Sequence, residues 1–120
     1  MPAAVSAFLN LDSVQPRGPA AINAKTGAAL NTAIGFLNAE RYDDARTAIG
    51  SLRLDRLSPY ERGKTEQILF HIANSERKYA EARQHLQNAI ESGGLTQQEV
   101  TQAQRQIEQI DARLATAPAA

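Results

Sequence analysis

The 120-residue chain contains no cysteine and no tryptophan, and aromatic residues make up only 5% of it. The absence of cysteine excludes a disulfide framework, a thiolate zinc site and a cysteine nucleophile. Hydrophobic residues still reach 42% of the chain, and many of them are alanine. A core built from such small aliphatic side chains suits closely packed helices better than a sheet.

The chain also lacks an excess of charge and a long apolar run. Thirteen Lys and Arg balance thirteen Asp and Glu, so electrostatics give no reason to expect nucleic acid or an anionic membrane as a partner. No apolar segment approaches the roughly 18–20 residues of a membrane span. The first residues, MPAAVSAFLNLDS, lack the basic stretch of a secretory signal. Because absence of cysteine fits cytoplasm and periplasm alike, the compartment stays open, and an exported protein would be seen here in its mature form.

The hydrophobic pattern predicts an all-α fold of about five helices joined by short turns. No segment alternates with a period of two for long enough to form a strand. Ser58-Pro59-Tyr60-Glu61 and Thr96-Gln97-Gln98-Glu99 are capping boxes that open two of these helices, and Gly93-Gly94 closes another. The expected helices span residues 20–39 (after Pro19), 42–54, 59–76, 79–92 and 96–115. Residues 1–19 are expected to form a flexible lead-in, and residues 117–120 a disordered tail.

One phrase occurs twice in the sequence. ERYDDARTAIGSL fills 40–52 and RKYAEARQHLQNAI fills 77–90, so that Tyr42 and Tyr79, and likewise Ala45 and Ala82, stand 37 residues apart. A fixed period of this length is typical of helical repeat proteins. We therefore expect one domain over residues 20–116, with helix–turn–helix units at 26–57 and 63–94 and a capping helix at 96–115.

The repeated residues resemble those of the tetratricopeptide repeat family, whose period is about 34. The resemblance lies in the small and large packing residues of the two units, which are Ala33, Phe36, Tyr42, Ala45, Ile49 and Leu52, then Leu69, Tyr79, Ala82, Leu86 and Ala89. The sequence departs from the family where Ala29 and Glu66 replace its tryptophan, and where Phe70 and Ala73 exchange large and small. The resemblance implies a right-handed solenoid of about two repeats plus the capping helix.

The same resemblance implies that the first helix of each unit lines a concave groove for a partner peptide or helix. The partner-binding residues expected on this face are Lys64, Gln67, His71, Asn74, Ser75, Gln104 and Glu108. The solvated face of an amphipathic helix explains the same residues equally well. The first unit instead presents an apolar docking face, made of Leu30, Ile34 and Leu37. This face could be covered by Phe8, Leu9 and Leu11 of the lead-in, receive a partner, or mediate self-association.

Nothing in the sequence predicts catalysis, a cofactor or a metal site. Glu81 and His85 are expected to form a surface ion pair, because no further ligands converge with them. The favoured function is a non-catalytic adaptor that binds a protein or peptide partner, and the alternative is a homo-oligomer that assembles through exposed repeat ends or the apolar face. Two repeats fall below the usual minimum of about three, so the chain also fits a piece of a longer array.

Overall fold

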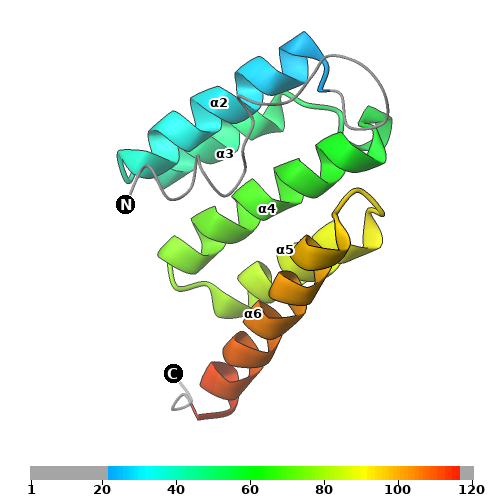
Figure 1. Cartoon of the computed structure of the whole chain (residues 1–120). Helices are drawn as coiled ribbons and strands as arrows, with labels where there is room; N and C mark the ends of the chain where they lie inside the picture. The colour runs from blue at the N-terminus through cyan, green and yellow to red at the C-terminus, as the bar shows by residue number, and fades with distance from the viewer. Residues whose placement is uncertain (1–21, 117–120) are drawn as a thin grey trace.

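A computed structural model describes residues 22–116, and within this range the chain forms five α-helices and no strand (Figure 1). The all-α prediction is therefore confirmed. The helices are α2 (Ala24–Asn38), α3 (Tyr42–Gly50), α4 (Pro59–Ser75), α5 (Tyr79–Glu91) and α6 (Gln97–Thr116), with a short 3₁₀ helix η2 (Leu54–Arg56) before α4. The predicted lead-in, the start of a helix at Pro19 and the tail at 117–120 lie outside the described residues.

Local hydrogen bonds explain where the helices begin. At α4 the hydroxyl of Ser58 accepts from the Glu61 N–H at 3.2 Å, while the Glu61 carboxylate accepts from the Ser58 N–H at 2.9 Å. Thr96 and Glu99 make the same reciprocal pair before α6, at 3.1 and 2.9 Å. Both predicted capping boxes are thus confirmed.

Two predicted boundaries in the first unit are wrong. The first helix begins at Ala24 instead of residue 20, because the Asn23 side chain caps it by accepting from the Lys25 N–H at 2.9 Å. The second helix ends at Gly50 instead of residue 54, because the Leu52 N–H bonds to the Ile49 carbonyl and tightens the turn that leads to η2.

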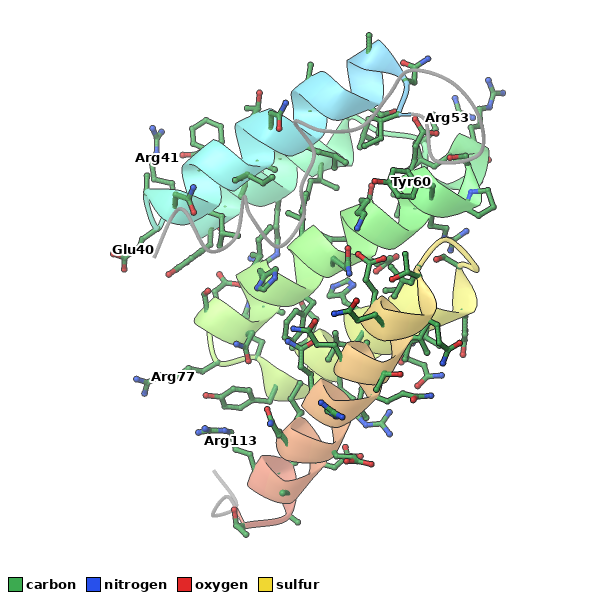
Figure 2. All side chains as sticks on the ribbon, viewed as in Figure 1. Glu40, Arg41, Arg53, Tyr60, Arg77 and Arg113 are labelled. Carbon is green, nitrogen blue, oxygen red and sulfur yellow. The ribbon has the colours of Figure 1, made fainter. Side chains whose placement is uncertain are left out.

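The turn between the two helices of a unit has the same backbone geometry in both units. Glu40 and Arg77 stand 37 residues apart, and both adopt a left-handed conformation, with φ of 61° and 62°. The next residue donates its N–H to a carbonyl five positions earlier, from Arg41 to Phe36 and from Lys78 to Ala73. Figure 2 shows both turns on one side of the molecule, marked by Glu40 and Arg77. The sequence repeat is therefore also a repeat of backbone structure.

Helix α4 lies between the other helices and contributes to two apolar cores. Figure 1 shows α2 and α3 paired on one side of α4, and α5 and α6 on the other. The first core contains Leu30, Ala33, Ile34, Leu37, Ala45, Ile49, Ile68 and Ile72. The second contains Phe70, Ala73, Ala82, Leu86, Ala103, Ile107 and Ile110. Ala45 and Ala82 are fully buried, as expected where two helices cross closely.

Candidate functional site

The first part of the predicted recognition face of α4 is buried. Lys64 is only 4% exposed and Gln67 only 3%. The Lys64 ammonium lies 2.5 Å from the Glu99 carboxylate of α6 and 5.4 Å from the centre of the Tyr60 ring. The prediction that Lys64 and Gln67 face a partner is thus wrong for this structure, because both side chains are buried and Glu99 of α6 already neutralises the lysine.

His71 is also unsuited to act as a cationic donor. Its side chain is partly buried on α4, and burial lowers the pKa of its imidazole to about 4. The ring is therefore neutral at pH 7. The charged, open groove expected along the first two-thirds of α4 is replaced by a buried polar seam.

The three apolar residues expected to form a docking face on α2 are core residues. Leu30, Ile34 and Leu37 are all buried, and they share one cluster with Ile49 of α3 and Ile68 of α4. The expectation of an exposed apolar patch at these positions is corrected by this packing. The expected cover by Phe8, Leu9 and Leu11 falls outside the described residues.

The remaining predicted residues, Asn74, Ser75, Gln104 and Glu108, are exposed. Of these, Asn74 lines a hollow. That hollow holds about 230 Å³ and lies where the last turn of α4, the first turn of α5 and the end of α6 come together. Its lining residues are Asn74, Tyr79, Gln109, Ile110 and Arg113, and we call it the α4–α6 hollow.

The α4–α6 hollow combines an apolar floor with polar groups at its rim. Ile110 is buried, while the Arg113 guanidinium lies 5.0 Å from the centre of the Tyr79 ring. Figure 2 shows Arg113 extending from α6 toward the turn that carries Arg77. Within residues 22–116, the side chains of Asn74, Gln109 and Arg113 make no hydrogen bond or ion pair with another side chain. Two amides and one guanidinium thus remain available to a ligand.

Sequence reasoning missed Gln109 and Arg113 because it chose a neighbouring stripe of α6. Gln104 and Glu108 form one stripe along α6, and Gln109 and Arg113 belong to the next. Because Glu108 and Gln109 are consecutive residues, the two stripes are about 100° apart around the helix. The spacing of Ala103, Ile107 and Ile110 fixes which stripe of α6 is buried, so the signal was present. What the sequence did not show is how far α6 rotates relative to α4.

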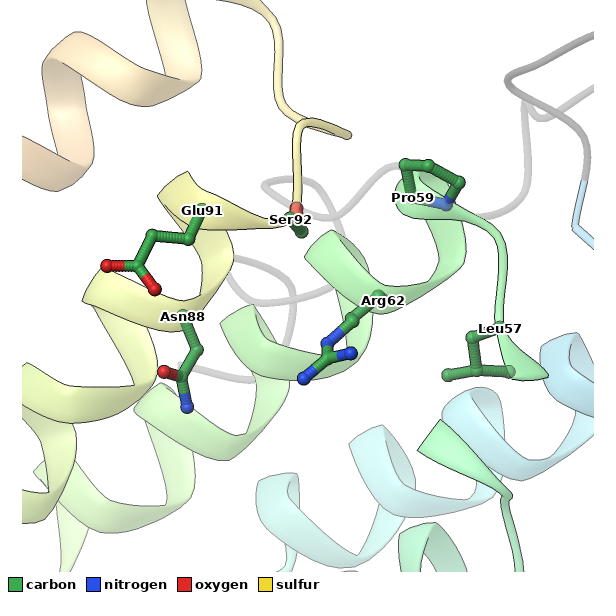
Figure 3. Close-up of a pocket in the computed structure, with 6 residues that line it drawn as sticks. All are labelled: Leu57, Pro59, Arg62, Asn88, Glu91 and Ser92. Atoms are coloured by element: carbon green, nitrogen blue, oxygen red, sulfur yellow. The ribbon is translucent and has the colours of Figure 1, made fainter. Parts of the chain in front are cut away.

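A larger hollow, of about 350 Å³, lies between the first turns of α4 and the last turns of α5 (Figure 3). Its lining residues are Leu57, Pro59, Arg62, Asn88, Glu91 and Ser92. Several of its polar groups already have partners. The Ser92 hydroxyl donates to the Ala89 carbonyl at 2.6 Å, and the Glu91 carboxylate accepts from Gln87 at 3.1 Å. This hollow therefore offers fewer free groups than the α4–α6 hollow.

Asn88 in the lining of that larger hollow contacts a buried carboxylate. Glu66 accepts from His85 Nδ1 at 2.8 Å, and the Asn88 amide approaches it at 3.4 Å. The predicted contact between His85 and Glu81 is also present, but it is longer, at 3.9 Å. The main partner of His85 is thus Glu66, which the sequence pattern did not indicate because it lies 19 residues away. Among residues 22–116 no three His, Asp or Glu side chains are grouped so that they could hold a metal ion.

No protein-family model matches this chain, and no curated protein or solved structure matches it. The resemblance to tetratricopeptide repeats therefore stays a prediction that rests on the residues and turns of this chain. No helix within residues 22–116 has the length and apolar character needed to cross a membrane.

Proposed function

We propose that the protein is a non-catalytic interaction module that binds a segment of a partner protein in the α4–α6 hollow. The observation that carries this proposal is the set of uncommitted donors, Asn74, Gln109 and Arg113, around the apolar floor of Ile110. Arginine and tyrosine side chains dominate the binding energy of many protein interfaces. The amides can bond to the backbone of an extended segment, and the guanidinium can bond to a carbonyl or carboxylate.

The exposed surface next to the hollow supports a protein partner. Leu114 is 40% exposed and is the one large hydrophobic side chain that stands out from the surface within residues 22–116. It follows Ile110 by four residues, so it continues the apolar line of α6 beside Arg113. An apolar side chain next to a polar rim is typical of a small protein-binding surface.

The scaffold of this proposal is a short tetratricopeptide-like array. Its support comes from the repeated left-handed turns at Glu40 and Arg77 and from the fully buried Ala45 and Ala82. In such an array, α2 and α3 form one unit, α4 and α5 the next, and α6 is the cap. The partner would then contact α4, which is the first helix of the second unit, and α6, which is the capping helix after that unit.

The outward face of α6 gives less support to the alternative of self-assembly through the repeat ends. Apart from Ala112, Leu114 and Ala115 near its end, its exposed residues are polar or charged, and they include Gln97, Gln98, Gln102, Gln104, Arg105 and Glu108. Such a polar face is stable in contact with solvent and is not suited to packing against a further repeat. Light scattering over a concentration series tests the alternative, because a homo-oligomer grows in mass and a capped monomer does not.

A pair of charge-reversal variants tests the proposed function. Arg113→Glu combined with Asn74→Ala removes the guanidinium and one amide from the hollow. Arg105→Glu with Gln102→Ala makes matched changes on the exposed face of α6. Both variants and the wild-type chain are used to capture proteins from the source cell, with quantification by mass spectrometry. We expect the hollow variant to lose its specific partner by about tenfold or more, and the control to keep it.

Circular dichroism separates loss of binding from loss of structure by comparing the helix content of each variant with that of the wild type. All four changed residues are exposed, so the substitutions should leave helix content unaltered. An unchanged set of captured proteins with the folded hollow variant contradicts the proposal. Equal loss in the control variant also contradicts it, because the effect then follows the net charge and not the site.

A further inference from the structure

A third hollow, of about 310 Å³, lies at the opposite end of α4 from the α4–α6 hollow. It is formed by the first turn of α2, the connector between α3 and α4, and the first turn of α4. The lining residues are Asn23, Lys25, Thr26, Ser51, Leu52, Arg53, Arg56, Leu57 and Glu61, and we call it the cationic hollow. Figure 2 shows Arg53 at this end of the molecule, away from Arg77 and Arg113.

Three cations line this hollow without a carboxylate partner. Within residues 22–116, Lys25, Arg53 and Arg56 take part in no ion pair. Elsewhere in the same range arginines do pair, for example Arg41 with Asp44 at 2.7 Å and Arg83 with Asp111 at 2.6 Å. This hollow therefore brings three unpaired cations together in one lining, in a chain whose net charge is zero.

The one carboxylate in the lining is occupied by the protein itself. Glu61 accepts from the N–H groups of Asn23 at 2.7 Å and Ser58 at 2.9 Å, and it is buried. Burial raises the pKa of this carboxyl, but these hydrogen bonds outweigh burial and hold the pKa below its usual value. Glu61 thus joins the start of α2 to the start of α4, and the three cations exceed its single negative charge.

We propose that the cationic hollow binds a phosphoryl group of a small phosphorylated ligand. Arginine forks match the oxygen geometry of phosphate, and a phosphate dianion offers more charge to three cations than a single carboxylate does. The Ser51 hydroxyl in the same lining already donates to the Ala48 carbonyl at 2.9 Å, so the three cations supply the donors for a phosphoryl group. The three cations surround a single hollow of about 310 Å³, which fits a compact anion better than a nucleic-acid backbone.

This site is independent of the proposed function, because the two hollows lie at opposite ends of α4, roughly 20 Å apart by helix length. A phosphorylated ligand at the cationic hollow can be present whether or not a partner binds near Arg113. Each proposal can therefore fail without affecting the other.

The test is a titration of the full chain with inorganic phosphate, monitored by ¹H–¹⁵N NMR. We expect saturable shifts in the amides of residues 23–26 and 51–57. Arg53→Gln with Arg56→Gln should weaken the affinity for phosphate by about tenfold or more, because each arginine supplies a charge-assisted bond. Arg77→Gln with Arg105→Gln removes two exposed arginines elsewhere, and it should leave the affinity unchanged. Lys25→Met gives an independent variant if the double change disturbs the connector.

Acetate at the same ionic strength distinguishes a phosphoryl site from a general anion patch. Phosphate shifts that saturate, map to the cationic hollow and are absent with acetate support the proposal. It is overturned if phosphate causes no saturable shift there, if acetate reproduces the shifts, or if the control variant weakens phosphate as much as the Arg53 and Arg56 variant does.

Discussion

At the scale of single residues, Gly94 allows two backbone segments to touch. A Cβ atom at this position would lie 1.9 Å from the Pro59 carbonyl oxygen and 2.6 Å from the Tyr60 Cα. Both are backbone atoms, so the contact cannot be relieved by a side-chain rotation. Gly93 has a different role, since its φ of 76° supplies the left-handed residue that ends α5.

Gly94→Ala should therefore destabilise the fold strongly, by about 3 kcal/mol or more, because the connector must move away from the start of α4. The matched change Gly35→Ala meets no atom within 4 Å and lies on the exposed side of α2, so it should stabilise by about 0.5–1 kcal/mol. Urea unfolding followed by circular dichroism gives both values. A wild-type midpoint for Gly94→Ala would show that the two segments are not in contact.

His71 makes stability depend on pH. Burial lowers the pKa of its imidazole in the folded state to about 4, while the unfolded chain keeps the usual value of 6.5. Between these values the unfolded state binds the extra proton, so the free energy of unfolding falls as pH drops below 6.5. We expect a loss of about 1–2 kcal/mol from pH 7 to pH 5 in the wild type. His71→Gln should remove most of this loss, and an equal slope in the variant contradicts the assignment.

At the scale of elements, the ends of the helices were predictable where a few neighbouring residues decide them. The Ser58–Glu61 and Thr96–Glu99 boxes close within three residues, and Gly93 acts on its own turn. Such local signals do not depend on how the helices pack. Asn23 is a similar local signal, an N-cap residue for α2. The predicted start was earlier because Gly18-Pro19 was interpreted as the beginning of the helix.

The candidate site was less predictable because it depends on contacts between distant residues. The family resemblance assigned Lys64 to an open groove, whereas the residue that neutralises it, Glu99, lies 35 positions away. Gln109 and Arg113 belong to the α4–α6 hollow only because of the rotation of α6. Asn74 is exposed and lines the same hollow, because the last turn of α4 extends beyond the buried seam, and its part in binding stays a prediction.

The Lys64–Glu99 pair holds α6 against α4, and its loss should be felt by the whole domain. Glu99→Gln leaves the buried Lys64 ammonium without a counter-charge and weakens the cap on α6, so we expect a loss of roughly 2–4 kcal/mol. Asp111→Asn removes a comparable contact from the same helix, to the exposed Arg83, and should leave stability close to that of the wild type. Thermal unfolding compares the two. If Glu99→Gln lowers stability as little as Asp111→Asn does, the buried Lys64–Glu99 pair has no structural role.

At the scale of the whole molecule, α4 contributes to both apolar cores, so we expect the two units to unfold together. Ile68 and Ile72 belong to the core shared with α2 and α3, while Phe70 and Ala73 belong to the core shared with α5 and α6. The pair of Arg46 on α3 with Glu76, just after α4, also connects the units. A repeat protein with separate cores could lose one unit and keep the other. Here the shared helix makes that separation unfavourable.

Ile72→Ala tests this cooperativity. Ile72 is fully buried in the first core, so its truncation should cost about 3 kcal/mol. If one transition unfolds the domain, hydrogen-exchange protection should fall by about a hundredfold in the central turns of α5 and α6 as well as in α2 and α3. The exposed Leu114→Ala should leave protection unchanged in all of them. Protection that falls in α2 and α3 while α5 and α6 keep their wild-type values would mean that the two units unfold separately, and that α4 does not couple them.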